Sequence, residues 1–173
     1  VLRLQRGQKV VISSNTLTTP NANKHNLTIR SDSHVTAAED SFHVYVSDNK
    51  LVGAINAWTM QIAPTANTQN NHIYDVIVER NWFLSGASTR AALVIQAAGV
   101  TVRNNIIDLT GGTGRIGVSI GNRNTAGVPT PDRNAVLNNT IRSNDSAGNF
   151  IGIQLGSAGE DITNTTVKNN LAY

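Results

Sequence analysis

The sequence predicts an all-β chain that folds as a right-handed, single-stranded parallel β-helix, a solenoid of about five to six stacked coils. Two observations carry this prediction. A segment of alternating apolar residues that ends in Asn recurs along the chain, and two further strand-length pieces accompany its copies. The composition agrees with many short strands joined by turns, because aromatic residues make up only 5% of the chain and Gly numbers 14.

The Asn-ending segment alternates apolar and polar side chains, as expected of a strand with one buried face. It stands at 76–81, 100–105, 134–139 and 165–170, and 27–32 is read as a further copy with Asp32 in the terminal position. A second motif with an apolar centre stands at 43–47, 92–96, 117–121 and 152–156, and a third piece follows the Asn directly at 82–84, 106–109, 140–141 and 171–172. The intervals between copies are unequal, which argues against a left-handed hexapeptide helix, and they fall within the about 20–50 residues typical of solenoid repeats. An up-and-down sandwich would not explain the recurring Asn.

Parallel strands about 4.8 Å apart stack like residues on like, so the repeat also predicts a register. The aliphatic positions expected to form one interior column are Val78, Val102, Val136 and Val167. The terminal positions expected to form an internal amide ladder are Asn81, Asn105, Asn139 and Asn170. Asn suits such a turn because it tolerates left-handed backbone and its amide can satisfy groups above and below it. The ladder is therefore interpreted as structural.

Three segments of the repeat, Val100–Asn105, Gly117–Ile120 and Gly152–Leu155, resemble the coil of the pectate-lyase-like superfamily of right-handed parallel β-helices. The resemblance covers residues 27–173, and residues 7–12 are expected to form an opening strand. It implies the fold. It implies no single activity, because that superfamily includes polysaccharide lyases, hydrolases, epimerases, phage tailspikes and adhesins.

In the resembled superfamily the cleft lies on the outer face of the second-motif strand, walled by long connections. Here those connections are expected at 47–72, 121–134 and 156–163, and the outward column is expected to be Tyr45, Val94, Ser119 and Gln154, flanked by His43, Ala92, Gly117 and Gly152. This column contains no pair of carboxylates, which a glycoside hydrolase needs. If the chain is an enzyme, a polysaccharide lyase is favoured, with its base among His43, Tyr45 and Lys50 and with Asp48 and His72 beside them. The alternative that these are ordinary surface residues stays open.

Five residues are the candidates for substrate binding: Tyr45, Trp58, Arg123, Arg133 and Gln154. Trp58 is preferred over Trp82 as a platform for a sugar ring, because Trp82 directly follows a ladder Asn and is expected to pack at the turn. Glu79 and Arg103 share an outward column and are expected to form an ion pair. No metal site or cofactor is expected; Ca²⁺ is the one ion considered, from acids at 132 and 160–161, without the regularly spaced oxygen ligands of a calcium loop.

The leading functional hypothesis is an extracellular, secreted carbohydrate-interacting β-helix of bacterial or phage type, either lyase-like or non-catalytic. The alternative is a structural or adhesive module such as part of a phage tailspike or surface protein. The expected partner is a polysaccharide or oligosaccharide, and end-to-end or trimeric self-association stays open. The net charge of +3 comes from scattered Lys and Arg rather than a basic patch, so no nucleic acid is expected. No apolar run approaches the roughly 20 residues of a membrane span. We expect residues 1–173 to form a single domain that is incomplete at its C-terminal end.

Overall fold

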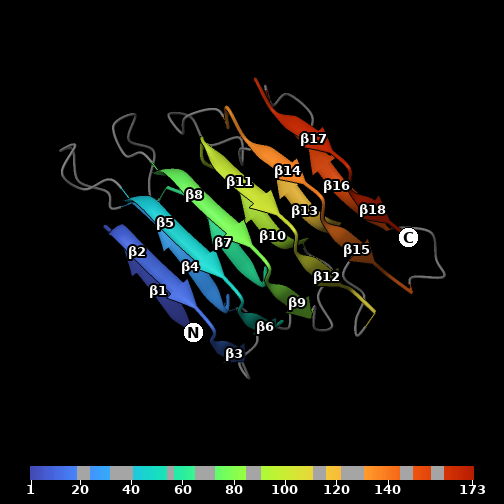
Figure 1. Ribbon diagram of the computed structural model, residues 1–173, viewed down its shortest axis with the longest axis horizontal. Coiled ribbons are helices and arrows are strands. Elements are labelled where there is room, and N and C mark those ends of the chain that lie inside the picture. Colours follow the sequence, from blue (N-terminus) through green and yellow to red (C-terminus); the bar gives the residue numbers. More distant parts are fainter. Residues whose placement is uncertain are drawn as a thin grey trace.

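The computed structural model confirms the all-β parallel solenoid. It describes residues 1–18, 24–31, 41–53, 57–64, 73–84, 91–110, 116–121, 131–144, 150–156 and 162–173. Within these ranges every regular element is a strand and none is a helix. The strands form three parallel sheets of six strands each, here called sheets A, B and C. Within each sheet the strands lie side by side along the long axis of the molecule, and the two chain ends lie far apart along that axis (Figure 1).

The chain visits the three sheets in a fixed order, so each passage adds one strand to each sheet. Sheet A contains β1 (Leu2–Gln5), β4 (Leu27–Arg30), β7 (Met60–Ile62), β10 (Ala91–Ile95), β13 (Ile116–Ile120) and β16 (Ile151–Leu155). Sheet B contains β2 (Gln8–Ser13), β5 (Ser41–Ser47), β8 (Ile73–Glu79), β11 (Val100–Arg103), β14 (Ala135–Leu137) and β17 (Thr166–Lys168). Sheet C contains β3 (Thr16–Thr18), β6 (Lys50–Val52), β9 (Trp82–Leu84), β12 (Ile106–Asp108), β15 (Thr140–Arg142) and β18 (Leu171–Ala172).

The interior is filled by aliphatic columns that run along the solenoid axis. In sheet B, Val78 pairs with Val102, Val102 with Val136 and Val136 with Val167, which confirms the predicted register. The first three of these side chains are fully buried. Sheet C contributes an equivalent column in which Phe83, Ile107 and Ile141 are fully buried. The strand period of two thus separates one buried face from one outer face in each sheet.

The asparagine ladder stands at the turn from sheet B to sheet C. Each buried ladder amide donates to the carboxamide oxygen of the next and accepts from the backbone N–H of the one before, as at Asn81, Asn105 and Asn139. The ladder continues through Asn170 and extends in the other direction through Asn49 and Asn15, two members that sequence analysis did not assign. The predicted structural role is therefore confirmed, with a longer ladder than predicted.

Left-handed backbone recurs at two corners of the coil. The residue before each ladder Asn has φ between 52° and 58°, in the order Ser14, Asp48, Arg80, Asn104, Asn138 and Asn169. At the corner from sheet A to sheet B, the equivalent residues with φ between 47° and 63° are Lys9, His43, Asp75, Gly99, Arg133 and Asn164. The left-handed residue thus precedes the ladder Asn. The expectation that the ladder Asn itself takes this conformation is wrong, because its side chain has to point into the coil.

The segment 43–47 lies in sheet B and not, as predicted, in the sheet of the second motif. Val44 pairs with Val76 and Tyr45 with Ile77, so β5 stacks on the Asn-ending strand β8. The ladder member that follows it is Asn49, whereas Asp32, which was assigned to that place, lies outside the described residues. The predicted long connection 47–72 is also wrong in part, because it contains β6 and β7. Apolar alternation looks alike in sheets A and B. The assignment of Asp32 as the residue that ends a sheet B strand therefore displaced the predicted strands of this coil by one position, so that Leu27–Arg30 was expected in sheet B and 43–47 in sheet A.

Two of the positions predicted to flank the outer column of sheet A face inward instead. Ala92 is 1% exposed and belongs to the core. At Gly117 an added Cβ would lie 2.5 Å from Cγ2 of Ile141 in sheet C and 2.6 Å from the carbonyl oxygen of Gly152. Gly therefore occupies this position because the interior is filled there by the opposite sheet.

Candidate functional site

The outer face of sheet A, where the resemblance placed the cleft, is covered at its centre. The outward column runs in register through Thr28, Gln61, Val94, Ser119 and Gln154. The first three are 5–6% exposed. Only Ser119 and Gln154 are partly exposed. This face therefore offers little accessible surface at the middle of the solenoid.

The outer face of sheet C is open. Its central column pairs Lys50 with Trp82, Trp82 with Ile106 and Ile106 with Thr140. The side chains of Trp82 and Ile106 are 41% and 50% exposed, whereas their neighbours Phe83 and Ile107 are fully buried. Alternation therefore presents large apolar groups to solvent here, and exposed apolar surface of this kind marks interaction sites.

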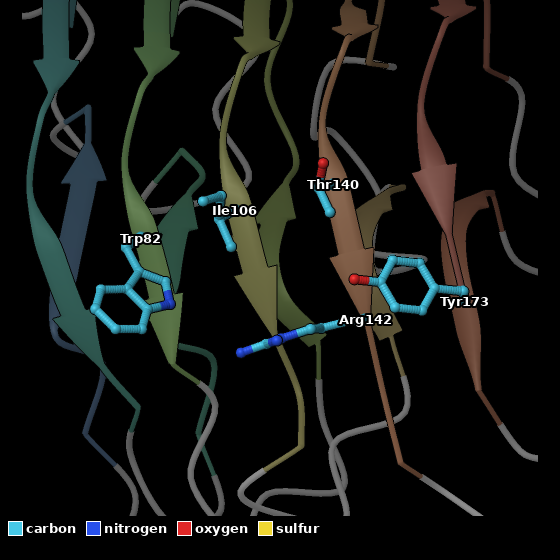
Figure 2. A pocket seen from close by; sticks show the side chains of 5 residues that line it. All are labelled: Trp82, Ile106, Thr140, Arg142 and Tyr173. Atoms are coloured by element: carbon cyan, nitrogen blue, oxygen red, sulfur yellow. The ribbon is translucent and has the colours of Figure 1, made fainter.

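The exposed groups line an open groove of about 310 Å³, which we call the sheet C groove. Its lining residues are Trp82, Ile106, Thr140, Arg142 and Tyr173. Figure 2 shows the rings of Trp82 and Tyr173 nearly face-on, with Ile106 and Thr140 between them and the Arg142 side chain extending toward the tryptophan side. The groove crosses neighbouring strands, so its length follows the solenoid axis.

Two cationic side chains border the groove, and they differ in their partners. Arg142 donates from Nη2 to Oδ2 of Asp108 at 2.5 Å, which raises the pKa of this guanidinium. Burial alone would raise the pKa of Asp108, but hydrogen bonds from Arg142 and Thr110 outweigh it and hold that pKa below its ordinary value. Lys50 instead places its Nζ over the Trp82 ring, 4.8 Å from the ring centroid. Arg142 is therefore fixed by a carboxylate, whereas Lys50 is held by an aromatic face.

The three predicted base candidates lie away from the sheet A column, two of them in sheet B and one in sheet C. Nδ1 of His43 lies within hydrogen-bond distance of the Asp75 carboxylate on the neighbouring strand, and both side chains are about half exposed. Tyr45 donates a hydrogen bond to the carboxylate of Glu79. Lys50 lies on sheet C. The three residues do not form one site.

Glu79 is the centre of a charged network on sheet B. Glu79 is 3% exposed, and its carboxylate accepts hydrogen bonds from Tyr45, Arg80 and Arg103. The predicted pair with Arg103 is therefore confirmed, but the carboxylate is buried and not, as expected, at the surface. The hydrogen bond from the Tyr45 hydroxyl is the largest influence on the pKa of Glu79 and lowers it. Burial raises this pKa, but together with Arg103 the hydroxyl holds it below its ordinary value. Arg80 also binds Asp48 through two parallel contacts of 2.9 Å. The two carboxylates and the two guanidinium groups of this network therefore balance one another in charge.

The predicted binding residues are dispersed. Trp58 precedes β7 and its ring stacks on His25, with ring centroids 5.2 Å apart and planes 7° from parallel. Gln154 lies in sheet A, paired with Ser119. Arg133 contacts its neighbour Asp132 at 3.0 Å. Arg123 and His72 lie outside the described residues.

Sequence analysis ranked the two tryptophans in the opposite order to their accessibility. The residue directly after a ladder Asn begins a sheet C strand and points outward, while the next residue points inward. The alternation Trp82-Phe83-Leu84 contained this signal, because only one of two adjacent aromatic residues can enter the core. The outward position of Trp82 was therefore predictable from the third strand piece, by applying its alternation to the residue that directly follows the ladder Asn.

In the described part of the chain, no three His, Cys, Asp or Glu side chains come together as metal ligands. The same part contains no helix of the length and apolar character needed to cross a membrane. Comparison with protein-family models, curated proteins and solved structures finds no match to this chain. The structure shows a parallel β-solenoid, and none of these comparisons supports the pectate-lyase-like superfamily specifically.

Proposed function

We propose that this chain is an extracellular carbohydrate-interacting β-helix that binds a polysaccharide along the sheet C groove. The observation that carries the proposal is the Trp82 ring, 41% exposed in an open groove between otherwise well-packed strands. A rigid indole provides a large contact area at low conformational cost. Burying its exposed face against the C–H face of a sugar ring would remove that apolar surface from water.

The rest of the groove supplies the mixed chemistry that a saccharide requires. Ligand sites combine apolar lining with a few placed polar groups. Ile106 provides apolar contact, while the Thr140 hydroxyl and the Arg142 guanidinium can bond to sugar hydroxyl groups. Since Asp108 holds Arg142 in place, little side-chain freedom is lost when a ligand binds to it.

The direction of the groove favours a linear polymer over a single sugar. Trp82 lies on β9, and Tyr173 follows β18, the third strand beyond it in sheet C. At about 4.8 Å per strand, the two rings are roughly 14 Å apart along the axis. A chain of several sugar rings can contact both, and affinity should therefore rise with the length of the oligosaccharide.

Binding without cleavage is the activity we propose for this groove. Hydrolysis of a glycosidic bond requires two carboxyl groups flanking it. Among the described side chains that line the groove there is no carboxyl group, and the nearby Asp108 is committed to Arg142 and Thr110. A non-catalytic polysaccharide-binding role fits these side chains.

Binding to a panel of neutral and acidic polysaccharides, measured by affinity electrophoresis and calorimetry, tests the proposal. We expect Trp82→Ala to weaken binding by roughly tenfold or more, as for truncated aromatic anchors in other interfaces. Trp58→Ala is the matched control, because Trp58 is stacked on His25 outside the groove. Equal loss from both variants, or binding unaffected by Trp82→Ala, counts against the groove. If no polysaccharide binds, the structural or adhesive alternative replaces the proposal.

A further inference from the structure

We infer that Lys50 makes the sheet C groove selective for saccharides that bear an anionic group, a carboxylate or sulfate, on or next to the ring that stacks on Trp82. This inference rests on the proposed function and names the ligand class of the same site. Lys50 is on this account a specificity-determining residue, whereas Trp82 is the platform.

The position of Lys50 is the first observation. It is directly in register with Trp82 on the neighbouring strand, and its Nζ lies 4.8 Å from the centroid of the indole. In the central column of sheet C the residues are Thr16, Lys50, Trp82, Ile106, Thr140 and Leu171, so Lys50 is the one charged member. The ammonium group therefore occupies the place where a sugar would meet the ring.

The partners of the groove cations are the second observation. Asp108 is 5% exposed and bound to Arg142 and Thr110, so its charge is already balanced. Within the described ranges, Lys50 has no carboxylate within ion-pair distance, and only the ring faces its ammonium group. Among the described residues, the groove consequently keeps one positive charge that no carboxylate neutralises.

A ligand that stacks on Trp82 replaces the contact between the Lys50 ammonium group and the ring, and the charge of the ligand decides what this ammonium group contacts instead. A neutral sugar that stacks on Trp82 has to displace the ammonium group and offers it no charged partner. An anionic sugar that stacks there pairs with the displaced ammonium group, so the lost contact is compensated by an ion pair. Because the site is solvent-exposed, the discrimination should be modest and should weaken as salt screens the charge.

Uronate polysaccharides in their ionised carboxylate form, here called the acid form, and in their fully methyl-esterified form provide the matched probes, since esterification removes the charge and adds only a methyl group to each ring. For the wild-type protein we expect the acid form to bind roughly threefold to fivefold more tightly at low salt. We expect this preference to fall with added salt. In Lys50→Met it should disappear, with the ester bound at least as tightly as by wild type. Lys168→Met, on the exposed outer face of sheet B, is the control and should keep the preference.

The results of these binding measurements distinguish a failure of the role given to Lys50 from a failure of carbohydrate binding itself. Equal binding of acid and ester by the wild type, or a preference that survives in Lys50→Met, overturns the role of Lys50 and leaves carbohydrate binding standing. Failure of every probe to bind overturns the proposed function and the inference with it. Thermal melting of both lysine variants shows that they fold, because each substituted side chain lies at the surface.

Discussion

Replacement of Asn105 by Ala removes one rung from the middle of the asparagine ladder. The Asn105 side chain is 1% exposed. Its Oδ1 accepts from the backbone N–H of Asn81 at 2.9 Å and from the Asn81 amide at 3.1 Å. Its Nδ2 donates to the carbonyl of Val78 at 2.9 Å, to the carbonyl of Arg103 at 3.0 Å and to Oδ1 of Asn139 at 2.9 Å. The substitution therefore affects three successive coils.

The expected cost follows from counting the groups that lose their partner. One buried group depends on the Asn105 side chain, namely the Asn81 backbone N–H. The Val78 carbonyl lies within the paired strands β8 and β11 and keeps its place in the backbone ladder. Oδ1 of Asn139 still accepts from the backbone N–H of Asn105, so it keeps a donor. With one buried donor left unsatisfied, at about 1–3 kcal/mol, we expect Asn105→Ala to lower the free energy of unfolding by about 1–3 kcal/mol.

Urea denaturation followed by circular dichroism measures this difference, and Asn15→Ala provides the control. Asn15 lies at an exposed turn, and its amide donates only to Ser13 and Asn49 within the described residues. No described group donates to its Oδ1, so we expect Asn15→Ala to cost under about 1 kcal/mol. If the two variants lose the same free energy, or if Asn105→Ala unfolds with the wild type, the ladder does not stabilise the solenoid in the way argued here.

Three further substitutions probe the interior and the charged network. Val102→Asp places an unpaired charge in a fully buried column and should abolish soluble expression, which fractionation of the lysate would show. Gly117→Ala should cost about 1–3 kcal/mol, because the new Cβ would lie 2.5 Å from Cγ2 of Ile141; an unchanged melting temperature would contradict the packing described for this corner. The pKa of Glu79 is lowered in the folded state, chiefly by Tyr45, so its stabilising effect is present above the unfolded value of about 4.3 and is lost as pH falls through the folded value. Glu79→Gln should therefore flatten the acid side of the stability profile, and an unaltered profile would exclude this carboxylate as its source.

Much of the fold could be predicted because the repeat fixes both period and register. An Asn at a constant distance after two alternating valines identifies a sheet B strand, as at 76–81 and 100–105, and the stacked valines and amides then follow. The same rule applied to Val44-Tyr-Val-Ser-Asp-Asn49 gives the correct sheet. The prediction placed Asp32 instead of Asn49 at the end of the sheet B strand in that coil. Asp32 fits a ladder position poorly, because a carboxylate cannot donate hydrogen bonds to its neighbours as an amide does.

The site was harder to predict, for a physical reason. Alternation tells which side chains point outward but does not tell which outer face remains open. Thr28 and Val94 point away from the core and are nonetheless almost fully buried, whereas Trp82 and Ile106 point outward and are exposed. Accessibility depends on which distant parts of the chain pack over a face, and no local pattern encodes it. The ion pair between Glu79 and Arg103 was predictable because it depends only on register.

A ¹H–¹⁵N spectrum of the two tryptophan indoles, recorded during titration with a bound polysaccharide fragment, tests the central claim most directly. The chain contains two tryptophans, so each Nε1–H gives one assignable resonance. Trp82 lies in the sheet C groove and Trp58 is stacked on His25 outside it. We predict that the Trp82 resonance shifts with ligand concentration while the Trp58 resonance does not. A shift of Trp58 alone, or binding that moves neither resonance, would contradict the assignment of the saccharide site to sheet C.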